Sequence, residues 1–335
     1  MELNYGLGFR LPSSRIDLVE QMRIGEMAAR MGYDTVLTSE TWGFDAFTRL
    51  GYLAARTNVR LGTAIVPVHS RTPSLLAQAI GTLSRLSSGA PILGLGLSSP
   101  TVMNDWHGVE FEPALRHERE TIEIVRKVLS GDPVEYDGHL FNLDFAPVRF
   151  VPPGDISIYL AAQGPTNVRL TGEFADGWMP TYIPLSNLED ARASLVEGAR
   201  ARGRDPDEVV TVPTVTTCVL EDGERARERC RETVAFYIGG MGTYHYRTLA
   251  ENGYRERANR IRDAWNEEDY EAARAAVSDE ILDEVALSGT PEYARQLLSA
   301  VPDSVDQLVT VPATRAPVEE IKATVRNVGE ILDPE

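Results

Sequence analysis

Two patterns of apolar positions alternate along the chain. Short, mostly apolar runs predict strands at residues 4–9, 34–39, 59–68, 91–97, 156–162, 177–181, 209–220 and 307–311. Longer stretches with an apolar residue at every third or fourth position predict helices at residues 16–31, 44–57, 74–86, 115–129, 166–174, 188–201, 223–237, 290–300 and 318–332. This order of strands and helices predicts an α/β fold.

The predicted strands are apolar throughout, which indicates that both of their faces are buried, as in parallel sheets covered by helices. About eight strand–helix units over more than about 250 residues fit a (β/α)8 TIM barrel, because right-handed crossovers between parallel strands close such a sheet. A doubly wound open sheet is the alternative. We expect residues 1–335 to form one barrel domain with two insertions, at about 134–151 and 239–287.

The chain is strongly acidic. It has 33 basic and 50 acidic residues, a net charge of −17, and such a surface repels phosphate backbones and anionic lipid heads. Lys127 and Lys322 are its only lysines. An acidic coat with little lysine predicts adaptation to concentrated salt, as in halophilic archaea. A GC-rich genome is the alternative for the missing lysine, but it does not explain the charge.

Other features narrow the class of protein further. Cys218 and Cys230 are too few for a disulfide framework, and no Cys/His cluster has the spacing of a zinc site. The chain contains no run of about 18 apolar residues, and its first residues lack the pattern of a signal peptide. We therefore expect a cytoplasmic protein that binds a small molecule and no metal, nucleic acid or membrane.

The strongest local signal runs from Ala161 to Asn167, where a strand ends in small residues, turns at Gly164 and opens a helix at Pro165. In a (β/α)8 barrel the active site lies at the carboxyl ends of the strands. The backbone N–H groups of Gly164, Thr166 and Asn167, with the helix dipole, suit a phosphate there. An ordinary strand–helix turn is the alternative, and the pattern alone does not decide between them.

Two more strand ends carry candidate chemistry. Glu40 is a candidate general acid or base if the fold buries it, Trp42 places an indole nearby, and His69 is a second acid–base candidate. A surface salt bridge for Glu40 and a packed imidazole for His69 are the structural alternatives. Gly94 and Gly96 lack the third glycine of a dinucleotide fingerprint, so close backbone packing is the better interpretation.

An ordered set of segments resembles the bacterial-luciferase-like superfamily, and in particular its coenzyme F420-dependent oxidoreductase branch (5,10-methylenetetrahydromethanopterin reductase-like). The segments are residues 31–34, 61–67, 71–78, 82–89, 94–96, 106–109 and 175–178. The resemblance covers about residues 4–240 and the last strand and helix, and it is weakest at 244–285.

The resemblance implies a (β/α)8 barrel that binds FMN or the 5-deazaflavin F420 at the strand ends. It implies a ring site against a bulge with a non-proline cis peptide bond between Ala64 and Ile65. It also implies a phosphate loop and further cofactor contacts. The residues at these positions are Gln163, Gly164, Thr166 and Asn167 for the phosphate, and Ser39, Leu97 and Ser98 for the rest of the cofactor.

The chain departs from its relatives at several positions. Many carry Asp-His at the end of the second strand, where this chain has Ser39-Glu40. A proton-donating carboxylate of the sugar-phosphate dehydrogenases corresponds to Ser99, and the lysines that bind the sugar phosphate there are absent. The glutamate on the first strand of many methylene-tetrahydropterin reductases is missing from residues 7–10. Both substrate classes are therefore poor matches.

We expect an oxidoreductase that transfers a hydride between C5 of coenzyme F420 and a small organic substrate. Glu40 is the first candidate for the accompanying proton, with Trp42 shaping the pocket and His69 as the second candidate. An FMN-dependent monooxygenase that uses O2 and a non-catalytic deazaflavin- or flavin-binding protein are the alternatives. The resemblance also implies a homodimer or higher homo-oligomer.

Overall fold

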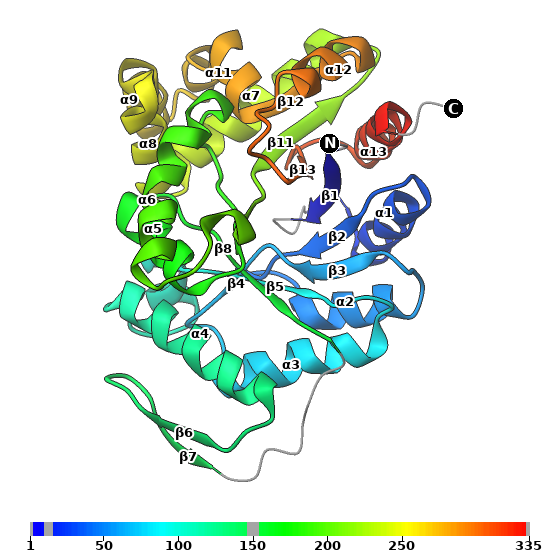
Figure 1. Ribbon diagram of the computed structural model, residues 1–335. Coiled ribbons are helices and arrows are strands. Elements are labelled where there is room, and N and C mark those ends of the chain that lie inside the picture. Colours follow the sequence, from blue (N-terminus) through cyan, green and yellow to red (C-terminus); the bar gives the residue numbers. More distant parts are fainter. Residues whose placement is uncertain (1–2, 10–15, 146–153, 333–335) are drawn as a thin grey trace.

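The computed structural model describes residues 3–9, 16–145 and 154–332. Its centre is a curled parallel sheet (Figure 1). The strands follow one another in the order β10 (Val210–Thr211), β9 (Gly177–Trp178), β8 (Ser157–Leu160), β5 (Ile92–Gly96), β3 (Arg60–Thr63), β2 (Thr35–Thr38), β1 (Asn4–Phe9), β13 (Gln307–Pro312), β11 (Thr214–Val219) and β12 (Ala286–Gly289), and β4 (Val66–Pro67) lies beside β5.

The two ends of this sheet meet in one stretch of chain. β10 and β11 are separated only by Val212 and Pro213. The first part pairs with β9, and the second part pairs with β13. Between them, Val212 N donates to Trp178 O at 2.7 Å, and Val309 N donates to Pro213 O at 2.9 Å. The sheet is thereby closed, and the predicted (β/α)8 TIM barrel is confirmed.

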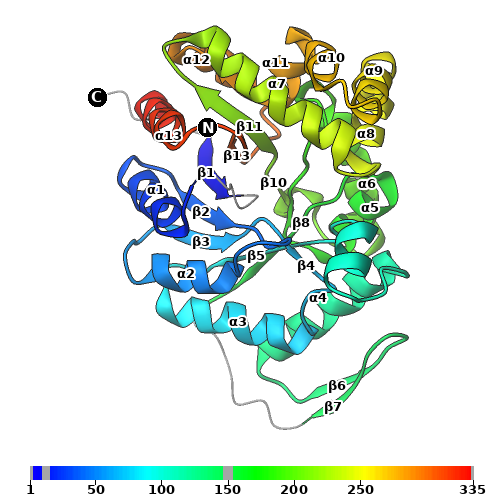
Figure 2. The ribbon, with the colours of Figure 1, turned by 180° about the vertical axis from the view of Figure 1, so that it is seen from behind.

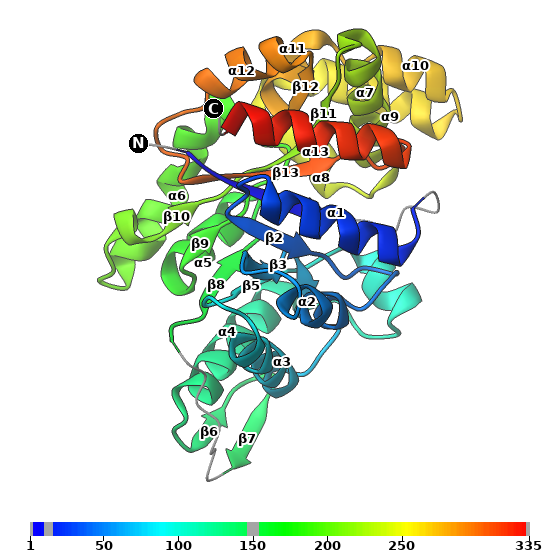
Figure 3. The same ribbon diagram turned by 90° about the vertical axis from the view of Figure 1, so that its right-hand side faces the viewer.

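Helices surround the barrel, and each follows the strand that the sequence assigned to it (Figures 2 and 3). They are α1 (Leu18–Arg30), α2 (Ala46–Ala54), α3 (Pro73–Leu86), α4 (Ala114–Ser130), α5 (Pro165–Phe174), α6 (Leu188–Ala201), α7 (Gly223–Gly240) and α13 (Val318–Leu332). Their apolar faces pack on the sheet, while Leu37, Ile92, Tyr159 and Val309 fill the barrel interior. The interior is therefore a packed core, as expected for this fold.

The strand predicted at residues 59–68 is split. β3 ends at Thr63, β4 begins at Val66, and the peptide bond between Ala64 and Ile65 is cis, as the resemblance implied. β12 was not predicted, because its sequence, Ala-Leu-Ser-Gly, contains no β-branched residue and directly follows a charged helix. It forms by adding to the free edge of β11.

Both predicted insertions fall between barrel elements. The first contains the antiparallel hairpin β6 (Val134–Asp137) and β7 (Asn142–Phe145), and residues 146–151 of that prediction lie outside the described residues. The second insertion begins at the end of α7 and packs against this helix (Figure 1). Its elements are α8 (Tyr244–Leu249), a π-helical turn (Ala250–Tyr254), α9 (Arg255–Asn266), α10 (Tyr270–Ala275) and α11 (Asp279–Val285). β12 begins at its end, and α12 (Pro291–Ser299) follows where the sequence predicts a helix at 290–300.

No helix in the described ranges is long and apolar enough to cross a membrane.

Gly94 offers a test of the packing between β3 and β5. A Cβ atom at Gly94 would lie 2.0 Å from Thr63 O and 3.3 Å from Met179 Sδ. Because this clash is with backbone, we expect Gly94→Ala to lower the free energy of unfolding by about 2–3 kcal/mol, the usual cost of overpacking a core.

The matched control is Gly51→Ala on α2, where a Cβ would meet nothing within 4 Å. There we expect a gain of about 0.5–1 kcal/mol, since alanine restricts the unfolded chain and favours helix. Urea denaturation measures both values, and equal stability of the two variants would contradict the tight β3–β5 contact.

Candidate active site

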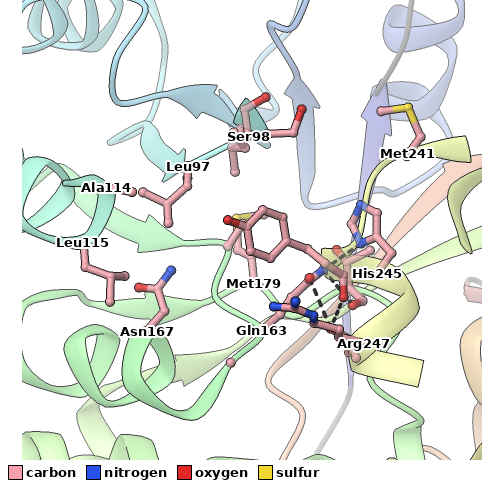
Figure 4. Close-up of a pocket in the computed structure, with 18 of the residues that line it drawn as sticks. Leu97, Ser98, Ala114, Leu115, Gln163, Asn167, Met179, Met241, His245 and Arg247 are labelled. Atoms are coloured by element: carbon pink, nitrogen blue, oxygen red, sulfur yellow. Dashed lines mark hydrogen bonds between the residues drawn. The ribbon is translucent and has the colours of Figure 1, made fainter. Parts of the chain in front are cut away.

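A cavity of about 790 Å³ opens where the barrel strands end (Figure 4). Residues that follow β2, β3, β5, β8 and β9 line it on the barrel side. The first turns of α4 and α5 form one wall, and the end of α7 with α8 forms another. The described residues hold no group of three or more His, Cys, Asp or Glu side chains able to bind a metal ion.

The floor of the cavity is an apolar slot. Ala64 and Ile65 of the split strand face Leu97, Ala161 and Met179 across it. Gly96 lets Ile65 and Ala161 approach β5 closely, because a Cβ there would lie 3.2 Å from Ile65 Cδ1 and 3.4 Å from Ala161 Cβ. Apolar walls with few polar groups are typical of sites for flat organic ligands.

Ser98, the second residue after β5, lines the same cavity with a φ of 63°. This left-handed conformation is unfavourable for residues other than glycine and is concentrated at functional sites.

The polar wall is the start of α5. Gly164 is its N-cap residue and supplies no side chain to cap the helix, whereas α1, α2, α3, α7 and α12 each have a side-chain cap. Within the described residues, the backbone N–H groups of Gly164 and Thr166 donate to no acceptor. The N–H of Asn167 donates to Gly164 O at 3.0 Å, so only two of the three predicted amides are available. Arg116 of α4 also lines the cavity and forms no salt bridge in the described ranges. This wall suits an anion.

Gln163 connects the barrel to α8. Its Nε2 lies 3.2 Å from Thr181 O, which can only accept, and 2.8 Å from Nδ1 of His245. Nδ1 must therefore accept as well, and a neutral His245 carries its proton on Nε2. Oε1 of Gln163 accepts from Thr248 Oγ1 at 3.2 Å. Gln163 was predicted as a cofactor contact, and it lines the cavity, but its amide also positions α8.

Glu40 lies on the cavity wall and is held by three donors. Its carboxylate accepts from Arg71 Nε at 3.2 Å, Arg71 Nη2 at 3.0 Å and the backbone N–H of Ala46 at 3.0 Å. Arg71 also pairs with Asp45, which caps α2. This carboxylate therefore joins the β2 end to α2 and to the loop before α3.

The structure places the other two predicted catalytic residues away from the cavity. His69 is buried, its Nε2 donates to Phe111 O at 3.0 Å, and its ring lies 4.1 Å from that of His117. Burial lowers the pKa of His69, so it is neutral near pH 7. Trp42 is 37% exposed and does not line the cavity. A strand end fixes where the backbone goes, and it does not fix the direction of side chains several residues further on.

The remaining predicted cofactor contacts do come together. Ser39, Ala64, Ile65, Leu97, Ser98, Gly164, Thr166 and Asn167 all line the cavity. The sequence analysis missed the contribution of α4, α7 and α8. The missed residues include Arg116, Tyr237, Met241, His245 and Arg247. They come from helices distant in sequence, and no local motif marks them.

The barrel, its apolar slot and the uncapped helix beside it form a cavity at the strand ends that suits a flat, anionic ligand. Residues 4–307 match the family model of the luciferase-like monooxygenases, and the chain belongs to this family.

Two named relatives extend over most of the chain. A putative coenzyme F420-dependent oxidoreductase of Mycobacterium tuberculosis is 30% identical over 349 aligned positions, covering 97% of this chain and 99% of the relative. The 5,10-methylenetetrahydromethanopterin reductase of Archaeoglobus fulgidus is 31% identical over 274 aligned positions, which cover 80% of this chain and 81% of the relative. The structure of coenzyme F420-dependent tetrahydromethanopterin reductase from Methanopyrus kandleri shares the fold, with a TM-score of 0.84 at 22% identity over 98% of each chain.

The Gln163 contacts predict a local effect of mutation. Gln163→Ala removes hydrogen bonds to Thr181, His245 and Thr248. At about 1 kcal/mol each, their loss should lower the free energy of local opening of α8 by about 2–3 kcal/mol. Hydrogen exchange of the amides in residues 244–252 measures this value.

Thr166→Ala is the matched control, because Thr166 also lines the cavity but its hydroxyl makes no hydrogen bond within the described residues. In the Thr166→Ala variant, the backbone amides of α8 should exchange at the wild-type rate. Unchanged exchange in Gln163→Ala would show that α8 is held by other contacts.

Proposed function

We propose that this protein is a coenzyme F420-dependent oxidoreductase that transfers a hydride between C5 of the deazaflavin and a small organic substrate. The observation that carries the proposal is one cavity that joins an apolar slot to an uncapped helix N-terminus. Its volume of about 790 Å³ suits a cofactor-sized ligand. The names of the two relatives support F420 over other flat anionic ligands.

The lining residues suit the parts of this cofactor. Ala64, Ile65, Leu97 and Met179 would hold the ring system in the slot, and Gly96 lets Ile65 pack close to β5. The unpaired N–H groups of Gly164 and Thr166 would bind the phosphate. When bound, the deazaflavin supplies a two-electron hydride carrier. The chain's own part is to orient it, exclude water and manage one proton.

Glu40 is the residue that we assign to this proton. It is a carboxylate at the cavity wall, and its donors Arg71 and Ala46 fix its position. Trp42 and His69 have no part in this assignment, since neither lines the cavity.

Glu40→Gln keeps the shape of the side chain and removes its acid–base chemistry. We expect turnover to fall by about 10²–10⁴-fold, the usual contribution of a general acid or base, while F420 still binds. The absorbance of reduced F420 follows turnover, with the best substrate of a panel of small carbonyl compounds and alkenes.

Asp45→Asn is the matched control, because it removes the other carboxylate on Arg71 from a position outside the cavity. Equal losses in the two variants would reduce Glu40 to a structural partner of Arg71, and unchanged turnover in Glu40→Gln would remove it from the mechanism.

We infer in addition that the protein works in concentrated salt. The net charge of −17 with only two lysines supports this, and so do the many arginine ion pairs on α7, such as those of Arg227 with Asp279 and Asp283. Binding and activity are therefore best measured at high salt.

Cofactor choice separates the proposal from its alternative, an FMN-dependent monooxygenase. We expect F420 to bind with a Kd of about 1 μM or less and FMN to bind at least about tenfold more weakly. Fluorescence titrations of the two ligands in parallel, in high salt, measure both constants. Tighter binding of FMN would favour the monooxygenase, and oxygen uptake with reduced FMN would then test it. If neither ligand binds, both assignments fail.

A further inference from the structure

Glu118 is a buried carboxyl group beside the cavity that the proposed reaction does not use. It lies in α4 and is 0% exposed. Among the residues that the structure describes, neither of its oxygens has a hydrogen-bond partner. Burying an ionised carboxylate without a donor is very costly, so a carboxyl group in such a place takes up a proton instead.

Asn167 is its neighbour on α5. The two helices pack against each other, and the Asn167 side chain interacts with the Glu118 carboxyl. Figure 4 shows Asn167 next to Leu115 of α4 on the cavity wall. Oδ1 of Asn167 is buried and also has no hydrogen-bond partner in the described part of the chain. A protonated carboxyl can donate to this oxygen, whereas a carboxylate can only accept, from Nδ2 of the same amide.

The surroundings of Glu118 favour its neutral form. Burial raises its pKa to about 8, and a hydrogen bond from the Asn167 side chain to the ionised carboxylate lowers it only in part. The elements packed on α4 are α3, α5 and β6. Their charged residues lie at the surface or in pairs and do not contribute to this pKa; they are Arg85, Arg169 with Glu173, Glu135 and Asp137. On α4 itself, Glu120 is buried and accepts from the backbone N–H groups of residues 139–141, and the ring of His117 packs on His69. Neither these two nor the other charged residues of α4 contribute to this pKa; the others are Arg116, Arg119, Glu123, Arg126 and Lys127.

We propose that Glu118, as a neutral carboxylic acid, donates its proton to Oδ1 of Asn167 and thereby turns the Asn167 Nδ2 towards the cavity, where it donates to the phosphate of the cofactor. The proposal rests on the proposed function and deepens it. Glu118 touches no ligand, so it is a positioning residue. It makes the side chain of Asn167 a third donor beside the backbone N–H groups of Gly164 and Thr166.

The same geometry gives the direction of a pH effect. Once Glu118 loses its proton, its carboxylate can only accept, so the Asn167 amide rotates to offer Nδ2 to it. Oδ1 then faces the cavity and repels an anion. Affinity for the phosphate is therefore present below the pKa of about 8 and is lost above it.

The test is a fluorescence titration of F420 at about pH 7 and about pH 9, on either side of that pKa. The wild type should bind about tenfold more weakly at the higher pH, the value of one hydrogen bond to a charged group. Glu118→Gln can still donate to Oδ1 but cannot ionise. It should match the wild type at the lower pH and bind more tightly than the wild type at the higher pH. Comparing proteins at one pH cancels any ionisation of the ligand.

Two further variants complete the design. Glu118→Leu has no donor and should bind weakly at both pH values. Glu123→Gln, which removes a carboxyl of α4 that pairs with Tyr136 outside the cavity, should keep the wild-type pH dependence. The infrared carbonyl band of a protonated carboxyl should be present in the wild type at about pH 7 and absent from Glu118→Gln, which checks the protonation without any ligand.

The outcomes separate this inference from the proposed function. If F420 binds but Glu118→Gln shows the same loss of affinity with pH as the wild type, Glu118 does not control the site. A missing infrared band overturns the inference as well. If F420 does not bind at either pH, the proposed function fails and the role of Glu118 fails with it.

Discussion

Closure of the barrel through residues 210–219 is the constraint on which the site depends. Because this one stretch pairs with β9 at its start and β13 at its end, the sheet has one mouth at which its parallel strands finish. The interior below that mouth is filled by side chains such as Tyr159 and Val309. The cavity for a ligand therefore lies at this mouth, where the split strand and the start of α5 both line it.

The hydrogen-bond donors at the cavity would bind an anion in a molecule whose net charge is negative. A chain with a net charge of −17 repels an anion at a distance. Near the cavity, the unpaired N–H groups of α5 and the side chain of Arg116 provide positive potential over a short range. Molar salt shortens the Debye length to about 3 Å, which screens the long-range repulsion and leaves these close contacts nearly intact. High salt and an anionic cofactor are thus compatible in one protein.

The sequence predicts the barrel well because its signals are local. Each strand and helix has its own periodicity, and the turn at Gly164 lies within a motif a few residues long. The cis bond at Ala64 was expected from the family resemblance alone. Contacts between distant segments have no such signal. Gln163 and His245 are 82 positions apart, and the pairing of Glu118 with Asn167 depends on how α4 packs on α5. The structure also gives Glu40 and His69 the salt bridge and the packed ring that the sequence left open as alternatives.

The central claim is that one cavity holds the ring of F420 in its slot and the phosphate at α5. A crystal structure of the protein soaked with F420 tests this most directly. We predict density for the ring against Ala64 and Ile65, and density for the phosphate within hydrogen-bond distance of the backbone N–H groups of Gly164 and Thr166. A ring placed outside the slot, or a phosphate bound away from the start of α5, would contradict the account.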